Sequence, residues 1–246
     1  MLLLDAGNSR VKWALIEGGA WSQQGAAENS QVEILRGIFA DLPPPQKILA
    51  SNVAGEKMAK QLQAACAIWP CPIEFIASRK EQCGVRNLYQ NTAQLGSDRW
   101  AALIAAWQQE RKSCLVVNCG TATTVDALSG QGEFLGGLIL PGIDMMQHSL
   151  VAGATSLGAA AITNGDWRQF PSNTADAIFT GAIQATVGAI YLQFEALAGQ
   201  GATSCILSGG AADSVQPYLR MPLVRVDNLV LRGLQIIGQD AMKAEV

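Results

Sequence analysis

The chain has 246 residues, of which 49% are hydrophobic and 15% are charged, and its formal net charge is −3 with a pI near 5.2. This composition excludes an intrinsically disordered chain, and the acidic balance argues against nucleic acid or an anionic membrane as the main partner. Because the sequence has no signal-peptide pattern and no uninterrupted apolar span, we expect a cytoplasmic protein with neither nucleic-acid nor membrane partners.

In the first half, hydrophobic periodicity predicts three meandering strands followed by alternating helices and strands. The expected strands lie at residues 2–6, 10–17, 20–26, 47–51 and 72–77, and the expected helices lie at 30–40 and 55–67. A series of this kind forms a mixed sheet with helices packed on it.

The first hairpin has the composition of a phosphate-binding turn. Gly7 permits a tight turn and a close approach of the backbone to a ligand, and Asn8 and Ser9 can donate hydrogen bonds to phosphate oxygens. Asp5 faces a polyphosphate only if a divalent cation lies between them, and Lys12 adds positive charge on the same hairpin. The same residues also suit an ordinary hairpin turn, which remains the alternative.

Residues 78–97 are polar and irregular, and a helix is expected at 98–111. Ser97 is a candidate N-cap for this helix, and Asp98 in its first turn has a plain structural role as a partner of the helix dipole. Arg99 is unfavourable at a helix N-terminus unless an anion compensates its charge. That anion is either Asp98 or a substrate.

The second half begins in the same way as the first. We expect strands from residue 114, through 123–125 and at 133–140, and helices at 142–152, 174–199 and 229–242. Residues 115–128 (LVVNCGTATTVDAL) align without a gap with residues 2–15 (LLLDAGNSRVKWAL). In this alignment Asn118 takes the place of Asp5, and Thr121 takes that of Asn8. The chain is therefore predicted to contain two copies of one fold.

A third strand leads into a glycine turn at residues 207–212 (LSGGAA). There Gly209 and Gly210 could lie under an adenosine, and Ser208 could bond to it. Three turns of small residues, drawn from both halves, predict a nucleotide held in a cleft between them.

Cysteine and histidine usage limits the possible chemistry. The six cysteines include no C-x-x-C pair, so we expect them to be reduced and structural. His148 is the only histidine, which leaves no material for a histidine-rich metal site or a Ser-His-Asp triad.

Together these motifs resemble the type III pantothenate kinases, a family that includes proteins named Bvg accessory factor. The matching segments are 5–9 (DAGNS), 95–99 (LGSDR), 118–121 (NCGT), 123–126 (TTVD), 136–142 (GGLILPG), 173–174 (NT) and 208–210 (SGG). The resemblance covers nearly the full length. It implies an α/β protein with the actin-like ATPase fold, in which two ribonuclease-H-like domains each have a mixed five-stranded sheet and flanking helices. We expect these domains at residues 1–112 and 113–246.

The resemblance also implies an activity, the ATP-dependent phosphorylation of pantothenate to 4'-phosphopantothenate by a homodimer that uses Mg²⁺. This reaction is the first step of coenzyme A biosynthesis. The alternatives are an actin-like kinase for another small hydroxyl or carboxylate acceptor, a non-catalytic transcription-accessory protein, and an actin-like ATPase that assembles or acts on polypeptides. The acidity of the chain speaks against direct DNA binding, and the absence of large insertions speaks against a filament or chaperone.

By position, the resemblance and the glycine turn at 208–210 imply roles for individual residues. Asp98 is the expected catalytic base, and Asp5 is the expected Mg²⁺ ligand. The expected ATP and phosphate contacts are Asp5, Ala6, Gly7, Asn8, Ser9, Arg10, Val11, Lys12, Thr121, Ser208, Gly209 and Gly210. The expected pantothenate contacts are Tyr89, Gly96, Ser97, Asp98, Arg99 and Thr174, the last supplied across the dimer. Arg99 would either pair with the substrate carboxylate or hold Asp98 in place.

Two positions depart from the family pattern. Thr92 stands where proline is usual, which makes the shape of the substrate loop an open point. Asn118 stands where many members have the aspartate of a potassium or ammonium site. An amide offers a carbonyl oxygen but no charge, so the monovalent-cation requirement that the family implies is in doubt for this chain.

Overall fold

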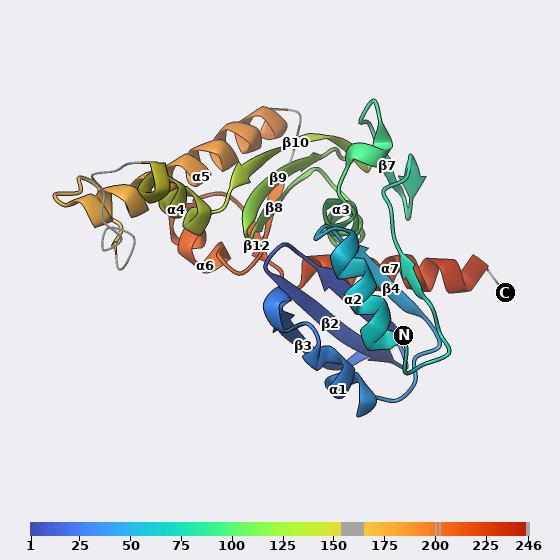
Figure 1. Ribbon diagram of the computed structural model, residues 1–246. Coiled ribbons are helices and arrows are strands. Elements are labelled where there is room, and N and C mark those ends of the chain that lie inside the picture. Colours follow the sequence, from blue (N-terminus) through green and yellow to red (C-terminus); the bar gives the residue numbers. More distant parts are fainter. Residues whose placement is uncertain (154–164, 200, 202, 245–246) are drawn as a thin grey trace. The chain divides into compact units, whose positions relative to one another are not determined.

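The structure is a computed structural model that describes residues 1–153, 165–199, 201 and 203–244 (Figure 1). By contacts the chain separates into two compact units, and each is described by itself. Unit 1 consists of Met1–Arg111, Gly132–Phe134 and the described part of Asn228–Val246, and unit 2 consists of Lys112–Gln131 and the described part of Leu135–Asp227.

Unit 1 is built on a five-stranded mixed sheet of order β3-β2-β1-β4-β5. Its strands are β1 (Leu2–Ala6), β2 (Arg10–Glu17), β3 (Ala20–Glu28), β4 (Ile48–Asn52) and β5 (Ile73–Phe75). Strand β2 is antiparallel to both of its neighbours, β1 and β3, whereas β4 runs parallel to β1 and β5 runs parallel to β4.

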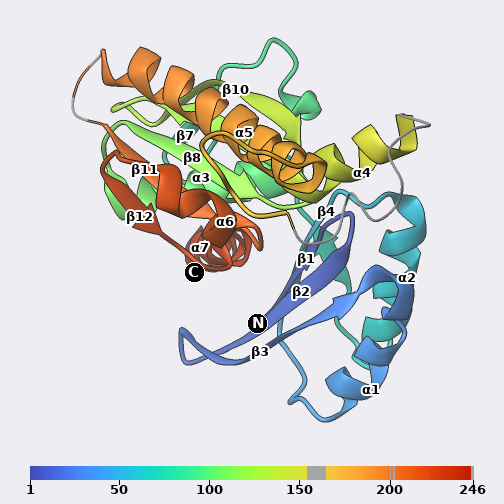
Figure 2. The same ribbon diagram turned by 90° about the vertical axis from the view of Figure 1, so that its left-hand side faces the viewer.

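Helices cover both faces of this sheet (Figures 1 and 2). They are α1 (Ile34–Ala40), α2 (Glu56–Cys66), α3 (Ser97–Glu110) and α7 (Leu229–Ala244). Leu35, Phe39 and Leu62 of α1 and α2 pack with β1 and β2 in one hydrophobic cluster, while α7 contacts β1 and β4 and packs along α3. Because both faces are covered, β1 has consecutive leucines that are all fully buried instead of an alternating pattern.

Unit 2 repeats the strand order of unit 1, as β10-β9-β8-β11-β12, but the sheet continues through β7 (Val85–Asn87) to β6 (Glu81–Gln82) and so has seven strands where five were predicted. Its elements are β8 (Cys114–Cys119), β9 (Ala122–Leu128), β10 (Glu133–Pro141), α4 (Ile143–Gly153), α5 (Thr174–Ala198), β11 (Ser204–Ser208), α6 (Ala212–Val215) and β12 (Leu223–Arg225). As in unit 1, the second strand is antiparallel to the first, and the fourth is parallel to it. The two equal orders confirm the predicted duplication.

The ungapped alignment of the two copies is wrong after the turn, because the second turn is one residue shorter. Ala6 pairs with Val11 across the first hairpin, but Cys119 pairs with Thr123 across the second. As a result the residue opposite Asn118 is Thr124, and not Val125 as the alignment without a gap requires.

Most predicted elements form within two residues of their expected ends, and the largest difference lies in the segment 78–97. Instead of being wholly irregular, it contains β6 (Glu81–Gln82), β7 (Val85–Asn87) and a 3₁₀ turn, Thr92–Gln94. Arg86 and Asn87 of β7 pair with Glu133 and Phe134 at the start of β10. A strand of three residues has no readable period, so its pairing with a distant segment could not be predicted.

The compact units do not coincide with the expected domain ranges 1–112 and 113–246. The difference comes from α7, which packs along α3 and so belongs to unit 1 by contacts, and from Gly132–Phe134, where the chain returns to unit 1. The domain boundary at 112 and 113 stays a prediction.

Candidate active site

The unit 1 turn, residues 7–10, is closed by a hydrogen bond from the Gly7 N–H to the Arg10 carbonyl at 3.1 Å. Asn8 and Ser9 are exposed at its tip. Beside it, Ala6 and Val11 are fully buried in the hydrophobic cluster, so only their main chains are available to a ligand. Of the predicted phosphate contacts, these two can act through backbone groups alone.

Glu28, the last residue of β3, and Asn29, which follows it, stabilise the same turn. The main-chain N–H of Asn29 donates to the Ser9 carbonyl, and its side-chain Nδ2 donates to the Gly7 carbonyl, both at 2.9 Å. Glu28 forms an ion pair with Arg10 at 3.4 Å between exposed side chains. Arg10 therefore already has an anionic partner within unit 1. The sequence reading missed Asn29, whose only local signal is a polar residue directly after a predicted strand.

Asp5 and Asp98 are linked through neighbouring serines. Asp5 lies opposite Ser51 in the parallel ladder of β1 and β4. The Ser51 and Ser97 hydroxyl oxygens are 2.9 Å apart, which connects the end of β4 to the first residue of α3. Ser51 is fully buried and was not among the predicted site residues.

The N-terminus of α3 is built around Gly96. The N-cap is Gly96 and not Ser97 as predicted, because Ser97 is already helical and its hydroxyl bonds to Ser51. A Cβ at position 96 would lie 2.5 Å from Asp98 Oδ1, so a side chain there would displace the carboxylate. The same Oδ1 accepts a hydrogen bond from the Arg99 N–H at 2.8 Å, which holds the carboxylate over the first turn.

The two carboxyl groups titrate above their ordinary range. Burial, and after it the charge of Asp98, raises the pKa of Asp5 from 3.8 to about 7, while Lys12 acts in the opposite direction. Burial also raises the pKa of Asp98, against the stabilising effects of the Arg99 N–H and the Arg99 charge. Buried carboxyls that repel each other are stabilised when a cation binds between them or beside them.

These carboxyls fit a Mg²⁺ ion of the kind that kinases use. Among the residues that the structure describes, no group of three or more acidic, histidine or cysteine side chains could hold a metal by itself. Mg²⁺ in nucleotide sites is ordinarily held by one or two carboxylates together with substrate phosphates and water. Asp5, with Asp98 nearby, supplies that number of ligands.

Arg99 packs against a pair of aromatic rings. Its side chain is buried, Nη2 donates to the Tyr89 hydroxyl at 3.4 Å, and Cζ is 5.9 Å from the Tyr89 ring centroid and 5.6 Å from that of Phe134. The two rings are 5.0 Å apart. Tyr89 and Arg99 are thus brought together as predicted substrate contacts, and Phe134, which supports both, was missed because it comes from β10.

The loop that carries Tyr89 has an internal hydrogen-bond framework. Asn87 Oδ1 accepts from the Tyr89 N–H at 3.0 Å, and Asn87 Nδ2 and the Ser78 hydroxyl both donate to the Thr92 carbonyl. Thr92 is the first residue of the 3₁₀ turn that Asn91 caps. Proline is well tolerated at a first helical position, so either residue suits this loop shape.

In unit 2, the predicted nucleotide residues lie at the ends of β8 and β11. Asn118 is opposite Ser208 in the parallel ladder, and the Ala211 N–H donates to the Cys119 carbonyl at 3.0 Å. Gly209 has φ +101°, and a Cβ there would be 2.2 Å from the Cys119 carbonyl oxygen, so this position requires glycine. A Cβ at Gly210 would meet open space, which leaves that residue available to a ligand.

The turns of unit 2 are also held by residues that the sequence reading missed. Arg225 Nη2 donates to the Gly209 carbonyl at 3.2 Å, and Arg225 pairs with Asp213 and Asp227. The Thr121 carbonyl accepts a hydrogen bond from the Gly142 N–H at 2.9 Å. Thr121 itself follows β8 in the turn at residues 120–122.

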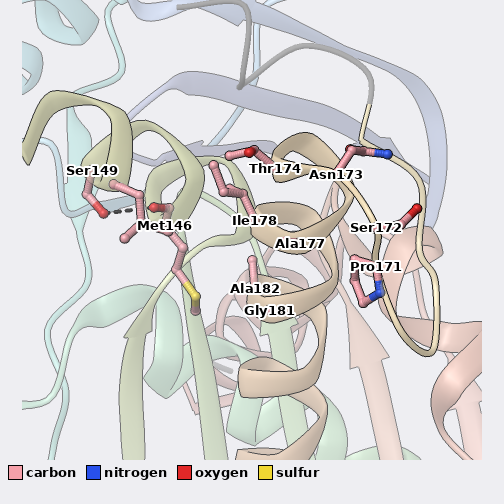
Figure 3. A pocket seen from close by; sticks show the side chains of 11 residues that line it. Met146, Ser149, Pro171, Ser172, Asn173, Thr174, Ala177, Ile178, Gly181 and Ala182 are labelled. Carbon is pink, nitrogen blue, oxygen red and sulfur yellow. Dashed lines mark hydrogen bonds between the residues drawn. The ribbon is translucent and has the colours of Figure 1, made fainter. Parts of the chain in front are cut away.

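Thr174 lies at a cavity of about 810 Å³ in unit 2. Figure 3 shows its walls, with side chains of α4 on one side and those of α5 and the segment before it on the other. Asn173 caps α5, since its side chain accepts a hydrogen bond from the Asp176 N–H at 2.9 Å. Within the described chain, Thr174 is the one predicted site residue that lines this cavity.

By length and composition α5 could cross a membrane, although 33% of its most apolar 18-residue stretch is buried within the structure. One such helix is weak support for a membrane span, because core helices of soluble proteins pass the same test. The sequence reading had found no candidate span, since polar residues interrupt this helix.

A model of the type III pantothenate kinase family matches residues 1–196. A type III pantothenate kinase of Nitrosospira multiformis is 48% identical over 243 residues, which cover 98% of this chain and 91% of that protein. Two solved structures resemble the whole chain. One is a conserved protein of Campylobacter jejuni assigned to the Baf family of transcriptional activators (23% identity, TM-score 0.63, covering 99% of this chain and 100% of that one).

The second structure is a protein of Sinorhizobium meliloti described as a 2-dehydro-3-deoxygalactonokinase (15% identity, TM-score 0.61, covering 98% of each chain). At these identities the two structures speak for the fold alone, and with the duplicated mixed sheets they confirm the predicted actin-like ATPase fold. The family match and the close relative go further, and they confirm the resemblance read from the sequence. The chain belongs to the type III pantothenate kinase family.

Proposed function

We propose that in this kinase, which uses ATP to phosphorylate pantothenate, Asp98 accepts the proton of the substrate hydroxyl. The observation that carries the proposal is the placement of its carboxylate. Gly96 leaves room for it, the Arg99 N–H orients one oxygen at 2.8 Å, and burial raises the pKa of the group. A carboxylate whose pKa lies above its ordinary value is a better proton acceptor near neutral pH.

In this mechanism the protein mainly positions the reactants. Phosphoryl transfer passes through a loose transition state, so alignment of the hydroxyl with the γ-phosphorus and compensation of charge dominate catalysis. The pantothenate oxygen bonds to the γ-phosphorus, the bond from that phosphorus to the bridging oxygen breaks, and ADP leaves. Asp98 takes the hydroxyl proton as the new bond forms.

The first hairpin would bind the phosphates. Main-chain N–H groups of residues 8–10 offer hydrogen-bond donors at this turn of unit 1, and the Lys12 ammonium adds positive charge on the same hairpin. Asp5 would hold Mg²⁺, which when bound neutralises charge on the phosphate oxygens. In unit 2, Thr121 and the turn of Ser208, Gly209 and Gly210 would contact the nucleoside.

Tyr89, Gly96, Ser97 and Arg99 are the proposed pantothenate contacts in unit 1. Pantothenate carries a carboxylate, and the planar guanidinium of Arg99, which packs against the rings of Tyr89 and Phe134, suits such a group. Arg99 also lowers the pKa of Asp98 through its charge, which opposes the effect of burial and favours the ionised form that can accept a proton.

We further propose that the kinase is a cytoplasmic homodimer without nucleic-acid or membrane partners. The support is exposed apolar side chains on unit 2, where Leu150 of α4, on the surface at the cavity, is 50% exposed and Leu192, further along α5, is 68% exposed. Thr174 lies at the cavity between α4 and α5, close to Leu150, so a partner subunit covering this surface would meet it. That arrangement agrees with a substrate contact supplied across the dimer.

One assay tests the proposed function. Purified protein with ATP and Mg²⁺ should turn over pantothenate, and other small alcohols and carboxylates, including sugars and acetate, should be phosphorylated at least 100-fold less efficiently. Repeating the assay with potassium, ammonium or neither measures the monovalent-cation requirement. Preferred turnover of another acceptor, or none at all, would overturn the proposal.

A further inference from the structure

Asn29 holds the unit 1 turn at two points. Its N–H donates to the Ser9 carbonyl and its Nδ2 donates to the Gly7 carbonyl, while the Gly7 N–H donates to the Arg10 carbonyl. The carbonyl oxygens of three turn residues therefore accept hydrogen bonds from within the protein. This matters for an anion, because carbonyl oxygens that point at a phosphate repel it whereas N–H groups attract it.

In the second copy of the fold, the residue after the third strand also donates a main-chain hydrogen bond to the turn. Gly142 directly follows β10 as Asn29 directly follows β3, and its N–H donates to the Thr121 carbonyl at the same distance of 2.9 Å. A Cβ at Gly142 would lie 2.3 Å from the Gly120 carbonyl oxygen, so in unit 2 the main chain at residue 142 packs directly against the main chain of the turn. In unit 1 the amide side chain of Asn29 makes the additional contact with the turn.

The environment of the Asn29 amide indicates which of its atoms are needed. Its Oδ1 is buried and accepts no hydrogen bond from the described residues, whereas Nδ2 donates to Gly7. A buried acceptor without a protein partner does not itself hold the amide in place, so the bond that Nδ2 donates is the one that fixes it. Here the donor side of the amide is the part that contacts the turn.

We propose that Asn29 is a positioning residue for ATP, which fixes residues 7–10 in the shape that presents the N–H groups of residues 8–10 to the phosphates. This inference rests on the proposed role of the first hairpin in binding ATP. Asn29 acts through the turn, and none of its own atoms needs to touch the nucleotide.

The test compares Asn29→Ala with a control that loses a similar bond elsewhere in unit 1. Gln235 Nε2 donates to the Gly19 carbonyl at 2.9 Å, at the opposite end of the β2 strand, so Gln235→Ala removes an amide-to-glycine bond far along the hairpin from residues 7–10. For Asn29→Ala we expect the KM for ATP to rise about 3- to 10-fold, with the KM for pantothenate within 2-fold of wild type. Gln235→Ala should leave both KM values within 2-fold.

Calorimetry of MgADP binding tests the role of Asn29 independently of whether pantothenate is the acceptor. If wild type binds MgADP but does not phosphorylate pantothenate, the acceptor assignment fails while the effect of Asn29→Ala on MgADP affinity still decides the role of Asn29. Asn29→Ser, which keeps the main-chain bond and a small polar side chain, serves if the alanine variant does not fold. An ATP KM and MgADP affinity within 2-fold of wild type, or equal losses for ATP and pantothenate, would overturn the inference.

Discussion

The two hairpin turns of the duplicated fold have the same main-chain hydrogen bonds but differ in length and in the side chains that they expose. In each, the N–H of a glycine bonds to the carbonyl at the end of the turn, at 3.1 Å for Gly7 and 3.0 Å for Gly120. In each, the residue that follows the third strand bonds to a turn carbonyl at 2.9 Å. The unit 1 turn is one residue longer and exposes Asn8 and Ser9, whereas the unit 2 turn is packed directly against Gly142.

The strand that enters each turn shows a second difference. Asp5 lies near Asp98, whose charge raises its pKa, whereas its counterpart Asn118 lies between Thr124 and Ser208 in the unit 2 sheet. The backbone pattern is therefore the same in both copies, while the carboxylate that enters the first turn is replaced by an amide at the second. We infer from this that unit 1 handles the metal, the phosphates and the proton, and that unit 2 handles the neutral nucleoside.

The largest expected effect comes from removing the charge that unit 1 uses in the reaction. Asp98→Asn keeps the size of the side chain but cannot accept the hydroxyl proton, so kcat should fall about 10²- to 10⁴-fold while the KM for ATP changes little. Steady-state kinetics measure both quantities. Asp41→Asn, at an exposed carboxylate at the end of α1, is the control. A kcat within 10-fold of wild type would remove Asp98 from this role.

Glycine substitutions in the two copies should separate a packed turn from an open one. A Cβ at Gly142 would meet backbone carbonyl oxygens at 2.3 and 2.6 Å, so Gly142→Ala should destabilise the protein by about 3 kcal/mol. A Cβ at Gly7 would meet the Arg10 carbonyl oxygen at an ordinary 3.5 Å, and Gly7→Ala should cost less than about 1 kcal/mol. Denaturant unfolding of both variants measures the difference, and equal losses would contradict the comparison.

A smaller effect is expected from the buried carboxyl in the absence of metal and nucleotide. Since the pKa of Asp5 is raised from 3.8 to about 7, the folded protein binds more protons than the unfolded chain between these values. The contribution of Asp5 to stability therefore decreases as pH rises through this window and is constant above it. Relative to wild type, Asp5→Asn should gain about 2 kcal/mol between pH 5.5 and 7. Thermal unfolding in EDTA across this range measures the gain, and a gain independent of pH would contradict the assignment.

Local patterns were enough to predict most elements, whereas the role of Asp98 as the base follows from the family resemblance and stays a prediction. The run of leucines before Asp5 and the glycine after it fixed the first hairpin, and the helix spacing after Asp98 fixed α3. Ser97 was assigned the wrong local role, because serine is a good N-cap in general. Here its hydroxyl bonds to Ser51, which lies 46 residues earlier in the chain.

What could not be predicted depends on segments that meet only in the folded units. Phe134 supports Tyr89 and Arg99 because β10 begins beside β7, and Arg225 reaches the Gly209 carbonyl because β12 lies beside β11. The sequence also does not reveal that the second turn is one residue shorter than the first. The residues after both turns are small or apolar, so they align equally well with or without a gap. These contacts follow from strand pairing, which single-sequence periodicity does not encode.

The smallest expected effect concerns the second turn, and it tests whether a carboxylate at position 118 would make the kinase respond to a monovalent cation. A carboxylate at position 118 would attract a monovalent cation at a partly exposed site, where such an interaction is worth about 1 kcal/mol. Asn118→Asp should therefore make the rate respond about 5-fold to potassium or ammonium, compared with choline at equal ionic strength. Wild type and Asn118→Ala should respond less than 2-fold. Equal stimulation of wild type and Asn118→Asp would mean that the amide oxygen of Asn118, opposite Thr124 and Ser208, already serves as a sufficient ligand.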